Sequence, residues 1–224
     1  MELERCSPNM EQGFPGNLEQ KIRYTLTDKN EFIIDYEMLS DMTTVINPTN
    51  HSYFNLDGHN SGSVLQHTLT LEADYFTPGD AQSIPTGEIL PVENTPMDFR
   101  EGRKIGERIE EEYEPLRFGN GYDHNWVLNT KGDISQVAAR LTSPETGITL
   151  EVYTNEPGVQ VYTGNFLDGT VTGKKGIVYN QRASVCLETQ HYPDSPNKAD
   201  WPSVVLEPGQ TYNSECIFKF SVEK

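Results

Sequence analysis

The chain has 224 residues, enough for one sizeable hydrophobic core, and 17 Lys and Arg against 34 Asp and Glu give it a formal net charge of −17. This acidic balance argues against nucleic acid and anionic membranes as partners, since both require a basic patch, and it weakens any function with a phosphorylated ligand. No apolar run reaches the roughly 18 residues of a membrane-spanning helix, the start lacks signal-peptide features, and Cys6, Cys186 and Cys216 form no disulfide framework. We therefore expect a soluble, cytoplasmic protein.

Alternation of apolar and polar residues with a period of two dominates the first 40 residues. Residues 22–26 and 32–38 each place their apolar side chains on one face, which predicts two strands. Residues 27–31 (TDKNE) between them have the composition of a hairpin turn. The two strands are therefore expected to pair antiparallel.

Residues 47–58 (NPTNHSYFNLDG) predict a short strand that enters a turn, with His51 followed by Ser52 and Tyr53. Core strands seldom carry Asn, His and Ser in a row, because each buried polar side chain needs a partner. The wall of a pocket for a polar ligand favours this mixture of donors, acceptors and aromatic faces. The alternative interpretation is a capped turn whose single histidine makes only structural hydrogen bonds.

The middle of the chain alternates between strand patterns and irregular segments. Residues 65–73 and 137–141 predict strands, and residues 75–99, rich in Pro and Gly, predict a long loop that is functional or packed as a lid. Residues 101–114 predict a short surface helix, because Ile105, Ile109 and Tyr113 recur at a spacing of four.

The pattern in the last part of the chain again predicts strands. Residues 148–152 follow a turn at 144–147, and residues 212–222 end the chain with alternating apolar side chains. Short strands joined by hairpins indicate an all-β fold with antiparallel sheets, most simply a β-sandwich. We find no repeat or linker, so we expect one domain over residues 1–224.

Three further residues have the chemistry of a polar site. Glu188 follows SVCL, so alternation places its charge among apolar neighbours, where burial would raise its pKa and make it a better base. Asp123 and Gln160 can bind pairs of hydroxyl groups. The alternatives are an outward-facing strand glutamate, a turn aspartate and an exposed strand glutamine.

The five histidines show no metal-binding spacing, so we expect no metal and no cofactor. Asp123 and Glu188 could instead be the acid pair of a glycosidase, which requires carboxyl groups about 5–10 Å apart. Cys186 and Cys216 lie in apolar strand patterns and are expected to be small core residues.

Five segments in order connect the chain to a known family: residues 13–17 (GFPGN), 47–58, 121–125 (GYDHN), 157–165 (PGVQVYTGN) and 186–194 (CLETQHYPD). Together they resemble the galactose mutarotase (aldose 1-epimerase) family over nearly the whole chain. The resemblance implies a large antiparallel β-supersandwich with a monosaccharide site in a cleft on one sheet.

The resemblance also implies residue roles. His51 would be the general acid, Glu188 the general base, and Asp123 and Gln160 would bind sugar hydroxyls. Ser52 and Tyr53 adjoin His51 in the sequence, so we expect them to add contacts. Opening a hemiacetal ring needs one acid and one base with pKa values near neutrality, and no cofactor. The implied activity is interconversion of the α and β anomers of a free hexose such as galactose or glucose.

Two segments of the family that precede this match have no counterpart here: Asn-Arg-Ile, whose arginine helps bind substrate, and Asn-His-Leu-His-Gly-Gly, with a second active-site histidine. The chain therefore corresponds to the C-terminal two-thirds or so of the family's domain. We expect weakened catalysis and self-association through an open sheet edge. The alternative function is a catalytically weak or inactive carbohydrate-binding module.

Overall fold

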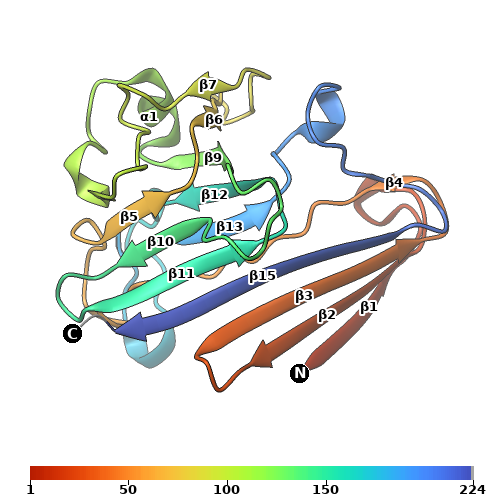
Figure 1. Ribbon diagram of the computed structural model, residues 1–224, viewed down its shortest axis with the longest axis horizontal. Coiled ribbons are helices and arrows are strands. Elements are labelled where there is room, and N and C mark those ends of the chain that lie inside the picture. The colour runs from red at the N-terminus through yellow and green to blue at the C-terminus, as the bar shows by residue number, and fades with distance from the viewer. Residues whose placement is uncertain (223–224) are drawn as a thin grey trace.

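The computed structural model describes residues 1–222, and antiparallel β-sheets dominate its architecture (Figure 1). The largest sheet within the described part of the chain has eight strands, in the spatial order β1 (Glu2–Ser7), β2 (Leu18–Leu26), β3 (Glu31–Ser40), β15 (Thr211–Val222), β11 (Ile148–Thr154), β10 (Ala139–Thr142), β5 (Thr68–Leu71) and β8 (Arg103–Lys104). This arrangement confirms the predicted all-β, antiparallel fold class.

A second sheet carries the strands that matter for the site. Its order over the described residues is β13 (Cys186–Gln190), β12 (Gly158–Tyr162), β9 (Asp123–Val127), β6 (Tyr75–Thr77) and β7 (Leu90–Pro91). A small ladder joins β14 (Val205–Leu206) to β4 (Thr44–Val45), and the short helix α1 (Glu114–Gly119) precedes β9.

The hydrophobic core is shared by the inner faces of the two larger sheets. Leu69, Leu141, Leu150 and Phe218 of the eight-stranded sheet and Phe76, Trp126, Val159, Val161 and Leu187 of the five-stranded sheet are all fully buried in one cluster. Apolar and polar residues alternate along each strand, so the apolar side chains share the inner face. Burial of each such side chain stabilises the sandwich by about 1.5–3 kcal/mol.

The hairpins were predicted correctly. β2 and β3 pair from Leu18 opposite Ser40 to Leu26 opposite Phe32, and the amide of Thr27 donates to the carbonyl of Glu31 at 2.9 Å to close the turn. The turn at 144–147 joins β10 to β11. Several strands were missed. One of them is β1, which consists almost wholly of exposed residues and has no apolar stripe.

The predicted helix over residues 101–114 is wrong. Gly102 has a left-handed φ of 72°, and the amides of Ile105 and Gly106 donate to the carbonyls of His67 and Leu65 instead of to a preceding turn. Ile105 and Ile109 are buried, so the spacing of four reflects burial and not an α-helix, and the helical structure between residues 103 and 113 is the short 3₁₀ helix Ile105–Glu107. The helix begins only at Glu114, with Pro115 in its first turn, where a missing N–H is tolerated.

Two other expectations need correction. The predicted loop over residues 75–99 contributes β6 and β7 to the five-stranded sheet at its ends and is irregular between them. The predicted strand within residues 47–58 is an extended segment that makes a single bridge, between Phe54 and Val185. The side chains of Asn47 and Thr49 and the backbone of Phe54 hold this segment beside β13.

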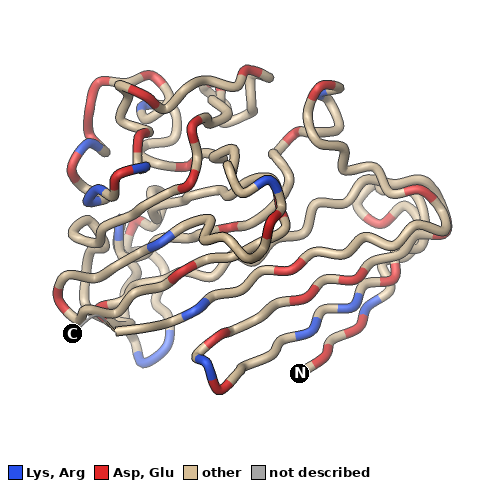
Figure 2. The backbone as a smooth tube through the Cα atoms, in the orientation of Figure 1, with Lys and Arg blue, Asp and Glu red and all other residues tan. Residues whose placement is uncertain are grey.

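Charge is spread over the whole molecule. Figure 2 shows acidic positions on most strands and loops, with basic positions scattered among them. Cys6, Cys186 and Cys216 are free thiols, the first exposed and the other two buried. Within residues 1–222 there is no helix with the length and apolar character needed to cross a bilayer.

Candidate active site

The strand register of the five-stranded sheet gathers polar side chains on the face opposite the core. Residues directly opposite one another in paired strands share a face, as do residues two apart in one strand. The pairings of β9, β12 and β13 therefore produce two rows of three side chains, Asn125–Gln160–Glu188 and Asp123–Tyr162–Cys186. Three of the predicted site residues thus meet on one surface although they are far apart in the sequence.

His51 reaches this surface from the segment that runs beside β13. The amide side chain of Asn47 donates to the carbonyl of His191 at 2.8 Å and accepts from its N–H at 2.9 Å. Thr49 Oγ1 donates to the carbonyl of Thr189 at 3.0 Å, and the Phe54 and Val185 backbones exchange two hydrogen bonds. These contacts fix both ends of the segment along β13, so His51 faces Glu188.

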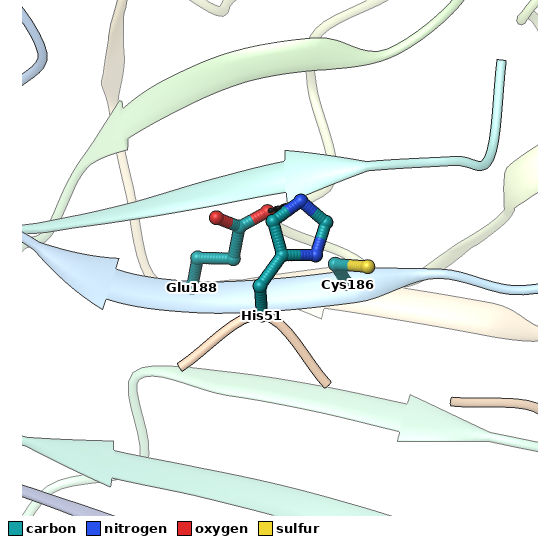
Figure 3. Close-up of side chains that lie close together, drawn as sticks. All are labelled: His51, Cys186 and Glu188. Atoms are coloured by element: carbon teal, nitrogen blue, oxygen red, sulfur yellow. Dashed lines mark ion pairs between the residues drawn. The ribbon is translucent and has the colours of Figure 1, made fainter. Parts of the chain in front are cut away.

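His51 and Glu188 form the centre of the site (Figure 3). The Nε2 atom of His51 lies 3.5 Å from Oε1 of Glu188. The imidazole side chain is 50% exposed, whereas the Glu188 side chain is only 9% exposed. The imidazole therefore lies on the solvent side, and the carboxylate is held in the sheet.

Burial changes the proton affinity of both carboxyl groups. Burial, assisted by the negative charge of Asp123, raises the pKa of Glu188 to about 7. Burial also raises the pKa of Asp123, although a hydrogen bond from Gln160 and the nearby His51 act in the opposite direction. The sequence-based expectation that Glu188 is buried with a raised pKa is confirmed.

Asp123 and Gln160 lie in contact. Nε2 of Gln160 donates to Oδ1 of Asp123 at 2.8 Å. The other side-chain atom, Gln160 Oε1, is buried and has no hydrogen-bond partner among residues 1–222. A buried acceptor without a donor is unfavourable by about 1–3 kcal/mol, so a ligand hydroxyl that donates to it would bind favourably.

The turn before Asp123 is held by a buried guanidinium. Arg182 donates to Oδ1 of Asn165 and, at 2.7 Å, to the carbonyl of Asn120. Gly121 has a φ of 122°, and a Cβ there would lie 2.6 Å from Arg182 Nη1. The turn therefore requires glycine at position 121, and it places Asp123, two residues later, on the polar face of the sheet.

His51, Asp123, Gln160 and Glu188 border an open cleft of about 370 Å³, a size suited to a small molecule. Its lining is made up of His51, Tyr53, Asp123, Gln160, Tyr162, Phe166, Glu188, Gln190 and Pro193. Of the six site residues expected from the sequence, Ser52 alone is not part of this lining, because its neighbours in the extended segment point into the cleft and it does not.

Several lining residues were missed by sequence reasoning, although a signal existed. Tyr162 lies two residues after Gln160, and Gln190 two residues after Glu188, so alternation puts them on the same face. The same rule places Cys186 beside Glu188. Cys186 is fully buried, as expected of a small core residue, but it borders the site and not the core between the sheets. His51, Cys186 and Glu188 together could hold a metal ion.

The sequence model of the family described as aldose 1-epimerase matches residues 1–219. Galactose mutarotase of Sus scrofa is 45% identical over 222 residues, which are 99% of this chain and 63% of that protein. Aldose 1-epimerase of Escherichia coli (strain K12) is 39% identical over 219 residues, which are 97% of this chain and 62% of that protein. The chain thus spans less than two thirds of the length of these relatives.

Solved structures agree with the sequence matches. The GalM/aldose epimerase homologue from C. elegans superposes with a TM-score of 0.88 at 31% identity, covering 100% of this chain and 66% of that one. Galactose 1-epimerase from Lactobacillus acidophilus NCFM gives a TM-score of 0.87 at 29% identity, covering 100% of this chain and 63% of that one. The predicted supersandwich fold is confirmed by these likenesses.

Proposed function

Because the chain belongs to the aldose 1-epimerase family, we propose that it interconverts the α and β anomers of a free hexose such as galactose or glucose by opening and reclosing the sugar ring. The observation that carries this proposal is the pair formed by His51 and the buried Glu188, 3.5 Å apart at an open cleft. The anomeric oxygen and the ring oxygen share one carbon, so an acid and a base close together can serve both.

Glu188 acts as the general base. Its pKa of about 7 lets the carboxylate take the proton of the anomeric hydroxyl and return it near neutral pH. His51 acts as the general acid that protonates the ring oxygen while the C1–O5 bond breaks. The open aldehyde then rotates about C1–C2, and the reverse transfers close the ring from the opposite face.

Asp123 and Gln160 position the sugar by binding its hydroxyl groups. Gln160 Oε1 accepts from one hydroxyl, which supplies the donor that this buried atom otherwise lacks within residues 1–222. Tyr53, Tyr162 and Phe166 present aromatic surface to the apolar face of the ring. Ser52 contributes only through the backbone segment that carries His51.

Polarimetry tests the proposed activity. Freshly dissolved α-D-galactose and α-D-glucose are expected to reach their equilibrium rotation faster with the purified chain than in buffer alone. A chain that binds these sugars in calorimetry but leaves the buffer rate unchanged would be the carbohydrate-binding module instead.

The pH dependence gives a sharper check on the base. Glu188 must be ionised to act, so kcat/KM is expected to fall about tenfold per pH unit on the acid side, below about pH 7. The general acid must be protonated, so kcat/KM is also expected to fall on the alkaline side, which gives a bell-shaped profile. The measurement is the polarimetric rate at a series of pH values after subtraction of the buffer rate at each pH. A rate that does not fall on the acid side contradicts the assignment of Glu188.

We propose that residues 1–224 form one domain, because one core cluster contains residues from Ile34 to Phe218. Three free thiols, one of them the exposed Cys6, support a reducing compartment such as the cytoplasm.

Self-association is proposed through β1, the outermost strand of the eight-stranded sheet. The amide of Tyr24 donates to the carbonyl of Met1 at 2.8 Å, and the register then alternates, so the N–H groups of Glu2, Glu4 and Cys6 point to the open side. Such donors pair with a second chain. The net charge of −17 opposes this pairing, so association is expected to strengthen with salt.

The variant Glu4→Pro tests this edge. Proline at this position removes an outward N–H and leaves the bonds between β1 and β2 intact, so the chain is expected to become monomeric. Glu4→Gln is the matched control, because it removes the same charge and retains the amide. The measurement is light scattering after size exclusion at low and high salt. A monomeric parent chain, or equal association of both variants, contradicts the proposal.

A further inference from the structure

Three side chains of different chemistry converge at the base of the cleft. The sulfur of Cys186, a ring nitrogen of His51 and a carboxylate oxygen of Glu188 all lie within 4.8 Å of one another. Figure 3 shows the three side chains together, with Cys186 and Glu188 on the same face of β13 and His51 opposite them. The proposed ring-opening chemistry uses two of these groups and gives the thiol no role.

We propose that His51, Cys186 and Glu188 form a binding site for a thiophilic divalent cation such as Zn²⁺, and that the bound cation inhibits the sugar reaction. Imidazole nitrogen, thiolate sulfur and carboxylate oxygen are the three donor types that zinc uses in proteins. Three protein ligands and a fourth position open to the cleft match the coordination number of a zinc site with an exchangeable ligand.

The spacing of the donors suits such a site. Tetrahedral geometry with metal–ligand bonds of about 2.0–2.3 Å places neighbouring donor atoms about 3.3–3.6 Å apart. His51 Nε2 and Glu188 Oε1, at 3.5 Å, already have this separation. The remaining separations, at most 4.8 Å, shorten by rotation of side chains, and the half-exposed imidazole of His51 has the freedom to rotate.

The local charge also favours a cation. Glu188 is buried and Asp123 half-buried on this face, and they repel each other, which contributes to the raised pKa of Glu188. No Lys or Arg occurs among the residues that line the cleft. A divalent ion relieves the repulsion between the carboxylates. Cys186 gives up its proton to solvent as the metal–sulfur bond forms, and no electron is transferred.

Metal and sugar compete for the same atoms. A cation on Glu188 occupies the carboxylate that must accept the anomeric proton, and a cation on His51 blocks the imidazole that must donate one. The inhibition rests on the proposed mutarotase function, whereas the metal site does not. Binding and inhibition can therefore be tested separately.

Cobalt(II) is the direct probe of the site, because a thiolate bound to Co²⁺ gives a charge-transfer band in the near ultraviolet. The purified 224-residue chain is expected to show this band on titration with Co²⁺ and to lose it when Zn²⁺ is added. Cys186→Ala is expected to abolish the band, and His51→Asn to weaken Co²⁺ affinity at least tenfold. Cys6→Ser is the matched control, because it removes the exposed thiol of β1 and is expected to leave the band unchanged.

The kinetic arm uses Zn²⁺ and polarimetry. Zn²⁺ is expected to inhibit the parent chain competitively with hexose. For each variant, the rate with Zn²⁺ is compared with the rate of the same variant without Zn²⁺. Cys186→Ala is expected to need at least tenfold more Zn²⁺ for half-inhibition. Cys186→Ser is a second variant of similar size, used if circular dichroism shows that the alanine variant does not fold.

The outcomes separate the two claims. A cobalt band that persists in both Cys186 variants, or a parent chain without a band, overturns the metal site. A band that depends on Cys186 in a chain without mutarotation upholds the metal site and removes the proposed function. Inhibition by Zn²⁺ that is equal in the parent and in the Cys186 variants also overturns the proposal.

Discussion

The variant Glu188→Gln is expected to lose about 10²–10⁴-fold in the rate of anomer interconversion while the fold is retained. Glutamine keeps the shape of the side chain and its position opposite Gln160 on β12, but it cannot accept the anomeric proton. The loss should fall on kcat, because the amide still occupies the cleft and the sugar contacts at Asp123 and Gln160 remain. Polarimetry under saturating sugar measures this quantity.

The same variant is expected to be more stable than the parent at alkaline pH. The folded chain raises the pKa of Glu188 from 4.5 to about 7, so the folded state binds a proton more tightly than the unfolded state. Stability therefore declines as pH rises from about 4.5 to about 7, and the full penalty of about 3 kcal/mol is present above that range. Glutamine has no charge to bury and escapes this penalty.

Urea denaturation at about pH 5 and about pH 8 checks the stability effect, with the larger gain expected at the higher pH. Glu37→Gln is the control, because Glu37 lies on a strand but is exposed, so neither rate nor stability is expected to change substantially. Full activity of Glu188→Gln would remove this residue from the mechanism. An equal gain at both pH values would mean that the carboxyl group is not a buried base.

Local patterns were enough to predict six strands of the eight-stranded sheet and the fold class, because alternation and turn composition act over a few residues. The same patterns failed at residues 101–114, where Ile105 pairs its amide with His67 and is buried by that contact. A spacing of four records which residues are buried, not which hydrogen bonds bury them. Tertiary contacts decided this segment, and no local signal reveals them.

Five of the nine residues that line the cleft were named from the sequence, but the way in which they assemble was not predicted. Asp123, Gln160 and Glu188 become neighbours only through the register of β9, β12 and β13, which depends on the pairing of strands distant in sequence. Cys186 illustrates the gap. Its apolar neighbours indicated a core residue, yet its place two residues before Glu188 puts it beside Glu188 and His51.

The variant His51→Asn is expected to lose about 10²–10⁴-fold in rate with little change in stability. Asparagine cannot deliver a proton to the ring oxygen. The imidazole stacks on Tyr53 with ring centroids 4.9 Å apart and makes an edge contact with Tyr162. Because the side chain is half exposed, these contacts bury little of its surface, and little packing is lost with the ring. Substitutions of exposed side chains usually change stability by less than about 0.5 kcal/mol.

His59→Asn is the matched control, because His59 is an exposed histidine that hydrogen-bonds to Tyr179 away from the cleft. Its rate and stability are expected to match those of the parent. A His51→Asn variant that unfolds more easily but retains its rate would show that His51 has a structural role only.

The double variant of His51 and Glu188 decides whether the two residues act together. Each ring opening needs a proton removed at one oxygen and a proton added at the other, so the loss of either group removes the concerted path. The double variant is therefore expected to be about as slow as the slower single variant, and not slower by the product of the two losses. Multiplicative losses would mean that the 3.5 Å pair serves two independent steps, and that acid and base do not act on one sugar in one event.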